Sequence, residues 1–156
     1  GTGDIQLTLC QKLSLDGVVM VTTPQEIALE DVRKGSEMFK KVNVPILGIV
    51  ENMSKLILKG RLNSDSENYD LQINNQNIRL DEKGEFEFEF KVFDGPGGLS
   101  ESNRINVPML GEICLDPKLS NSIDDGIPFV LNNDNDNITK EFERIVEVIK
   151  KTLDKP

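Results

Sequence analysis

The chain has 156 residues, with 18 lysines and arginines against 27 aspartates and glutamates, and a formal net charge of −9. A surface this acidic repels phosphate backbones and anionic lipids, which excludes nucleic-acid binding and membrane attachment through a basic patch. The chain contains no histidine, which excludes Ser–His and Cys–His nucleophilic sites and imidazole zinc sites. Its two cysteines, Cys10 and Cys114, are too few for a disulfide framework and predict a reducing, cytoplasmic compartment.

The length suits one domain with a hydrophobic core, or one domain with a small appendage. No apolar run approaches the roughly 20 residues that span a bilayer, and no charged-then-apolar leader opens the chain. We therefore expect no membrane association. Because the first residue is Gly1 rather than methionine, we expect the chain to begin inside a longer protein.

Residues 1–53 alternate between helical patterns and buried strands. A helical pattern over 5–12 precedes a continuous apolar run, 17–22, which is typical of a strand buried on both faces of a parallel sheet. A helix over 24–41 follows, with proline at its first position, and a second apolar run occupies 46–50. Strand, helix and strand with short connections predict a right-handed βαβ unit.

Residues 55–93 follow a different pattern, with apolar and polar residues in strict alternation. The apolar positions are Tyr69, Leu71, Ile73, Ile78, Leu80, Phe86, Phe88, Phe90 and Val92. This period of two predicts antiparallel strands with one solvated face, on which Glu85, Glu87 and Glu89 would lie. Residues 81–84 supply a turn, and 56–62 could add a strand. We expect a β-meander, residues 55–94, inserted into an α/β domain made of 1–54 and 95–156.

The α/β pattern resumes after the insert. Residues 107–113 predict a third buried strand, and Asp116-Pro117 predicts the start of a short helix that Gly126 closes. Residues 128–131 are a brief fourth strand candidate. The last helix, about 139–154, places a stripe of apolar residues on one face.

The candidate site lies beyond the strand ends, where open parallel sheets bind ligands. The segments that follow the three apolar runs are 22–25, 51–54 and 114–117. Gly1–Asp4 is a glycine-rich turn before a helix, which presents amides to an anion. The amide of Asn52 can both donate to and accept from a purine edge. Taken singly, such features are more often ordinary turns and helix starts.

Taken together in order and spacing, these segments resemble a known family. The matching blocks are Gly1-Thr-Gly-Asp4 onward, 21–25, 28–35, 38–54, 95–98, 107–113, 115–117 and 126–128. They are similar to the C-terminal half of the Mrp/ApbC family, the iron–sulfur cluster carrier ATPases related to MinD, ParA and the nitrogenase iron protein. The resemblance covers about three-quarters of the chain, and its block over 42–54 is the most specific.

The resemblance implies part of a P-loop (Rossmann-like, MinD/ParA type) fold, a parallel sheet with helices on both faces. It implies an ATPase that works as a homodimer with ATP and Mg²⁺ at the subunit interface, and iron–sulfur acceptor or assembly proteins as partners. The tail of the switch II segment, near the γ-phosphate, would be Gly1, Thr2, Gly3 and Asp4. Asn52 would hydrogen-bond adenine, and the base would be lined by Ile113, Cys114 and Asp116. Cys114 stands where the family usually has proline, and it can serve as a small hydrophobe.

Two departures limit what the resemblance carries over. No G-x-x-x-x-G-K-[ST] loop is present, so the residues that hold the phosphates and Mg²⁺ are expected upstream, and this segment alone should not hydrolyse ATP. No cysteine pair follows Ser54, where cluster-bridging relatives carry C-x-x-C, so ligands for an iron–sulfur cluster are absent there. An alternative is therefore a cluster-free relative whose insert docks a protein partner under nucleotide control. A third reading is a non-catalytic segment that merely folds.

Overall fold

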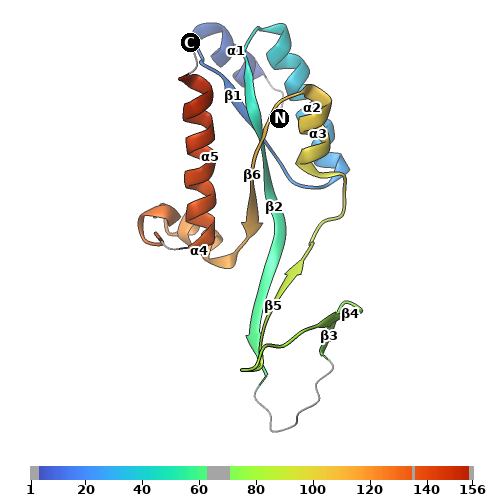
Figure 1. Cartoon of the computed structure of the whole chain (residues 1–156). Coiled ribbons are helices and arrows are strands. Elements are labelled where there is room, and N and C mark those ends of the chain that lie inside the picture. Colours follow the sequence, from blue (N-terminus) through green and yellow to red (C-terminus); the bar gives the residue numbers. More distant parts are fainter. Residues whose placement is uncertain (1–3, 63–70, 135, 155–156) are drawn as a thin grey trace.

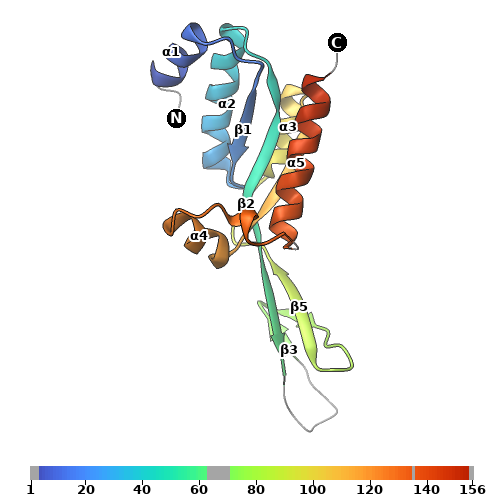
Figure 2. The same cartoon turned by 90° about the vertical axis from the view of Figure 1, so that its left-hand side faces the viewer.

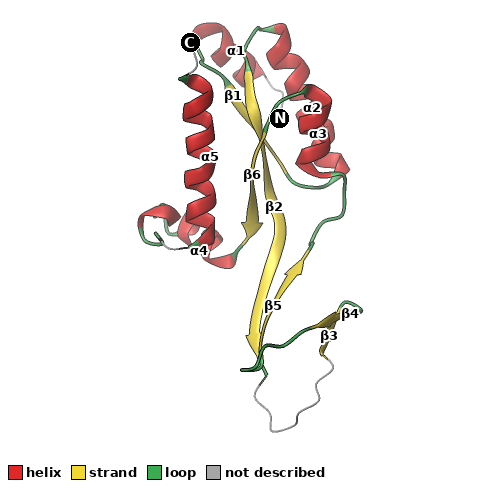
Figure 3. Cartoon of the chain, in the orientation of Figure 1, coloured by secondary structure: helices red, strands yellow, loops and turns green. Residues whose placement is uncertain are grey.

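The structure is a computed structural model that describes residues 4–62, 71–134 and 136–154. A sheet lies between helices on both of its faces, and a narrow pair of strands projects from one end of this body (Figures 1 and 2). Figure 3 shows that the helices are confined to the body and that the projection is built of strands and loops. The expected α/β class is confirmed.

The sheet is organised around one long strand, β2 (Ile46–Arg61). The first half of β2 pairs in parallel with β1 (Val18–Thr22) on one side and β6 (Met109–Leu115) on the other. Its second half pairs antiparallel with β5 (Glu85–Phe90), from Leu56 opposite Phe90 to Arg61 opposite Glu85. We call this second half of β2 together with β5 the arm.

Close approach between β2 and β6 depends on a glycine. Gly48 has φ +156°, and a Cβ at this position would lie 2.6 Å from the carbonyl oxygen of Pro108 and 2.5 Å from Cγ of Leu110. Any side chain would therefore separate the two strands. The pairing with β6 becomes irregular between Asn52 and Leu56, where Met53 has φ +55°. This irregularity marks the point at which β2 leaves the body and enters the arm.

The helices bury two separate cores, one on each face of the sheet. The helices are α1 (Asp4–Lys12), α2 (Glu26–Lys41), α3 (Gly97–Ile105), α4 (Pro117–Asp124), the 3₁₀ turn η1 (Phe129–Leu131) and α5 (Asn137–Leu153). On the α2 and α3 face the core residues are Met20, Val32 and Ile49. On the α5 face they are Val50, Leu110, Ile113, Phe129, Ile138 and Ile145. Successive side chains of β2 thus pack into the cores on opposite faces of the sheet, as its continuous apolar run predicts.

Four local expectations are corrected. Residues 128–131 form no strand: Pro128 has no N–H for a ladder, and it caps η1 (Phe129–Leu131), its carbonyl accepting from Leu131 N at 3.1 Å. The runs at 46–50 and 56–62 belong to one strand, β2. The expected antiparallel insert is present but lies in two parts: β3 (Leu71–Ile73) and β4 (Gln76–Ile78) pair with each other in a two-stranded sheet, whereas β5 pairs with β2. Helix α3 was not expected.

Candidate functional site

The carboxyl ends of β2 and β6 bring predicted site residues onto adjacent strands. Asn52 is the register partner of Ile113, so the two strand ends that were expected to meet the base are neighbours in the sheet. Ile113 is buried, and Asn52, Cys114 and Asp116 are half-buried. This is the edge at which parallel sheets bind ligands.

A cavity of about 470 Å³ lies at the end of β6 and is within the size range of small-molecule sites. Four segments enclose it: the root of the arm, the end of β6, the start of α4 and the start of α5. Its lining residues include Ile113, Cys114 and Asp116, so the structure brings together three of the residues expected to line the base. Their assignment to a base stays a prediction.

Three of the four carboxylates that line this cavity are held by internal partners. Asp116 caps α4 by accepting a hydrogen bond from Lys118 N at 2.7 Å, and Asp136 caps α5 by accepting from Ile138 N at 2.8 Å. Glu141 accepts from Arg144 at 2.6 Å and from the Glu112 amide at 3.0 Å. These bonds, that from Arg144 above all, hold the pKa of Glu141 below its ordinary value despite burial. With these three carboxylates engaged, the apolar residues of the lining offer contact surface to a flat, neutral ring.

Cys114 contributes a neutral wall to the cavity. Burial raises the pKa of the Cys114 thiol, and the nearby Lys55 only partly offsets this effect. The side chain is therefore protonated near neutral pH and behaves as the small hydrophobe that the sequence predicts.

Asn52 lines a different hollow, which it shares with the end of β1 and with α2. Its Oδ1 atom accepts a hydrogen bond from the Met53 backbone N–H at 3.0 Å. Asn52 and Asp116 thus line separate hollows, although the family resemblance assigns both to one adenine site and they lie on adjacent strand ends. The role of Asn52 toward adenine stays a prediction.

The N-terminal candidates are only partly visible. Gly1, Thr2 and Gly3 lie outside the described residues. Asp4 is exposed and is the first residue of α1. Its predicted position near a γ-phosphate is not tested by this structure.

Sequence reasoning missed Glu51, a buried carboxylate beside the site. Glu51 is 9% exposed and accepts a hydrogen bond from the backbone N–H of Gly98, in the first turn of α3. Gly97 has φ +70°, and a Cβ there would lie 2.7 Å from Glu51 Oε2. The glycine run at 95–98, which returns the chain from the insert, therefore lets a helix N-terminus approach the end of β2. This glycine run was the feature of the sequence that could have indicated the contact between Glu51 and α3.

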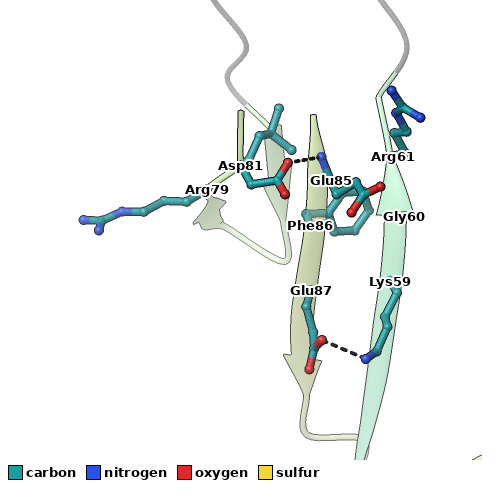
Figure 4. Close-up of a pocket in the computed structure, with 9 residues that line it drawn as sticks. Lys59, Gly60, Arg61, Arg79, Asp81, Glu85, Phe86 and Glu87 are labelled. Atoms are coloured by element: carbon teal, nitrogen blue, oxygen red, sulfur yellow. Dashed lines mark hydrogen bonds and ion pairs between the residues drawn. The ribbon is translucent and has the colours of Figure 1, made fainter. Parts of the chain in front are cut away.

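The arm carries a third, open hollow near its tip (Figure 4). Lys59 and Glu87 pair across the two strands at 2.8 Å, and the ring of Phe86 covers Gly60, where a Cβ would lie 2.6 Å from it. No residue assigned to a site from the sequence lines this hollow. It is best explained as packing between the arm and the segment that follows β4.

The described residues gather no group of three histidine, cysteine, aspartate or glutamate side chains able to hold a metal ion. Cys10 lies on α1 and Cys114 at the end of β6, and neither forms a disulfide. In the same part of the chain no helix has the length and apolarity to cross a membrane.

Comparison with known proteins identifies the family. Residues 1–150 match the family model described as ParA, NUBPL iron-transfer P-loop NTPase. An iron–sulfur cluster carrier protein of Aquifex aeolicus is 34% identical over 155 residues, 99% of this chain and 35% of that protein. An Arabidopsis thaliana iron–sulfur protein required for NADH dehydrogenase, mitochondrial, is 31% identical over 98% of this chain and 41% of its own length.

A solved structure supports the same fold. The cell division ATPase MinD of Pyrococcus furiosus aligns with a TM-score of 0.55 at 22% identity, over 87% of this chain and 43% of that one. The chain thus spans about a third to two-fifths of the length of the curated relatives that it matches. The parallel sheet, the strand-end site and the family match agree, and the chain belongs to the ParA-type iron-transfer P-loop NTPases.

Proposed function

We propose that this chain forms the base-binding half of the nucleotide site in a longer P-loop ATPase that carries iron–sulfur clusters. One observation carries the proposal: Ile113, Cys114 and Asp116 lie together around a cavity at the end of a parallel strand. Relatives that match nearly the whole chain are named iron–sulfur cluster carrier proteins, which supports the same function.

In this proposal the described residues receive the adenine of ATP. Ile113 and Cys114 pack against the ring, and Asp116 shapes the rim by holding the start of α4. Asn52 lies on the adjacent strand end but lines a separate hollow. To offer its amide to the purine edge, it has to leave the Met53 N–H and turn toward the end of β6. The phosphates and Mg²⁺ take their ligands from a phosphate loop outside these 156 residues, together with the Gly1–Asp4 turn.

The remaining parts of the proposal concern the assembly and its cargo. We propose a cytoplasmic homodimer that transfers its cluster to acceptor or assembly proteins, with residues 55–94 as an inserted module. Because no cysteine pair follows Ser54, the cluster is held by ligands other than a C-x-x-C at this point of the chain.

Nucleotide binding is tested in the full-length protein with a fluorescent ADP analogue. Cys114→Phe fills the cavity and should weaken binding at least about tenfold, and the smaller Cys114→Val should give an intermediate loss. Leu131→Phe adds the same ring at a residue that is 68% exposed on η1, and should bind as wild type does. Circular dichroism confirms that each variant folds. Failure of the wild type to bind, or equal binding by all variants, refutes the proposed site.

Cargo carriage is tested separately by anaerobic reconstitution of the full-length protein with iron and sulfide. Visible absorption bands typical of a cluster, lost on transfer to an acceptor apoprotein, are the expected result. A protein that binds ATP but develops no such bands would retain the nucleotide site and lose the carrier function. Binding of a protein partner through the arm, dependent on nucleotide, would then become the better explanation.

A further inference from the structure

The arm begins as the continuation of the strand that ends at the base cavity. After the irregularity at Met53, β2 resumes its contact with β6 through Leu56, the register partner of Leu115. The root of the arm is therefore held against the end of β6, where Ile113 and Cys114 lie. Leu56, Ile57 and Lys59 are among the residues that line the cavity.

The two faces of the arm differ sharply in chemistry. On one face Leu56, Leu58 and Gly60 stand opposite the phenylalanines of β5. On the other face, the residues of β2 stand opposite Glu89, Glu87 and Glu85. Lys59 faces Glu87 with a salt bridge of 2.8 Å, and Arg61 faces Glu85.

Ile57 departs from the pattern of the charged face. It stands opposite Glu89, and of the six paired positions on this face it is the one apolar residue. An isoleucine opposite a glutamate gains little from the strand pairing itself. Its position in the cavity wall explains both its apolar character and its half-buried state.

Lys59 completes this wall with its aliphatic stem. Its ammonium group is held at Glu87, its direct register partner, so the four-carbon stem extends toward the neighbouring strand β5. A lysine in this position covers apolar surface while its charge stays in solvent. The wall nearest the arm thus consists of Leu56, Ile57 and Lys59, whereas the capped carboxylates lie on the α4 and α5 sides.

We propose that Ile57, flanked by the stem of Lys59, contacts the bound purine and helps to set nucleotide affinity, so that the inserted arm is part of the nucleotide site. This inference rests on the proposed function, because it takes the same cavity as the base site. It assigns the insert a direct role in ligand binding, with the ring packed between Ile57 on one side and Ile113 and Cys114 on the other.

Photo-crosslinking tests the contact directly. Azido-ATP, which carries its photoreactive group on the adenine ring, is irradiated with the full-length protein and the tryptic peptides are mapped. Cleavage after Lys55 and Lys59 isolates residues 56–59, and cleavage after Arg104 and Lys118 isolates residues 105–118. Labelling of both peptides, suppressed by excess ATP, is the expected result. Labelling of 105–118 without 56–59 overturns the inference and leaves the proposed function intact.

A pair of neighbouring variants tests the energetic role. Ile57→Ala should raise the dissociation constant for ATP about tenfold, because it removes apolar contact with the ring. Leu58→Ala is the matched control: it shortens the next residue of the same strand, which faces Phe88 and does not line the cavity. Leu58→Ala should change affinity less than about twofold, even if it loosens the arm. Equal losses for the two variants overturn the inference, and absence of binding by the wild type refutes the proposed function instead.

Discussion

Replacing Glu101 with glutamine tests whether a buried carboxylate holds α2 and α3 together. Glu101 is 1% exposed on α3 and accepts hydrogen bonds from Arg104 at 2.9 Å and from Arg33 of α2 at 3.3 Å. Arg104 also donates to Ser36 of α2 at 3.1 Å, which extends the cluster across both helices. Glutamine keeps the size of the side chain but removes its charge. Both guanidinium groups then lose a charge-assisted acceptor.

The expected cost follows from how far the partners are buried. Removing one member of a fully buried ion pair costs about 3–5 kcal/mol. Here Arg33 and Arg104 keep 31% and 39% of their side-chain surface in solvent, and Arg33 retains Glu26 and Glu30 as partners. We therefore expect the free energy of unfolding to fall by about 2 kcal/mol, which corresponds to a Tm lower by about 4–8 °C.

The cost should also depend on pH. Burial by itself raises the pKa of Glu101, but the hydrogen bonds from Arg104 and Arg33 outweigh it and hold the pKa below the ordinary value of 4.5. A lowered pKa in the folded state means that the stabilisation is complete above the unfolded-state pKa and is lost as pH falls through the folded-state pKa. The difference between wild type and Glu101→Gln should therefore be full at neutral pH and shrink below about pH 4.

Urea denaturation followed by far-ultraviolet circular dichroism, at neutral and at acidic pH, measures both effects. Glu37→Gln is the matched control, because Glu37 is an exposed residue of α2 that pairs with Lys40 at 3.2 Å. It should cost less than about 0.5 kcal/mol at either pH. Equal losses for the two variants, or a loss for Glu101→Gln that persists undiminished in acid, would refute the reasoning.

Three further expectations follow from single side chains. Leu110 is fully buried in the core on the α5 face, so Leu110→Ala should lower the free energy of unfolding by about 2–5 kcal/mol in the same titration. A loss below about 1 kcal/mol would contradict the packing of this core. Asp136→Ala removes the cap of α5 and should cost about 1 kcal/mol, whereas Asp136→Asn should retain most of it. With Cys10 replaced by serine, alkylation of Cys114 by iodoacetamide should require a higher pH than alkylation of an unstructured cysteine peptide, because burial raises the thiol pKa. If the two pH–rate profiles coincide, the Cys114 thiol is exposed.

The sequence predicts those parts of the fold that depend on local runs and spacings of apolar residues. Continuous apolar runs mark β1, the first half of β2 and β6, and the helical spacing of α2 and α5 is equally plain. Asp116-Pro117 predicts the start of α4 because capping is a local property. Helix α3 escapes prediction because its leucine, Leu99, is 58% exposed while its glutamate, Glu101, is buried. Arginines from α2 and α3 stabilise this buried carboxylate and so reverse the usual burial pattern of a helix. The sequence of α3 alone cannot reveal a contact that depends on α2.

The candidate site was predictable only in part for a similar reason. Cys114 and Asp116 follow an apolar run, so their place at a strand end is visible in the sequence. Ile57 reaches the cavity because β2 continues through a polar stretch and through Met53, which has a left-handed backbone conformation. From the sequence, such a stretch predicts the end of a strand. The arm root and the start of α5 line the same cavity although they lie about 80 positions apart, and no local pattern predicts this arrangement.

The unbroken course of β2 has a consequence for how such an appendage can be acquired. Sixteen residues at about 3.3 Å each give a strand roughly 50 Å long, which serves the body in its first half and the arm in its second. An appendage that forms by extension of an existing strand pair needs no new core and no linker where it joins the body. Each added pair of residues makes its own backbone hydrogen bonds. Variation in length at this point therefore alters the reach of the molecule while leaving the two cores of the body unchanged.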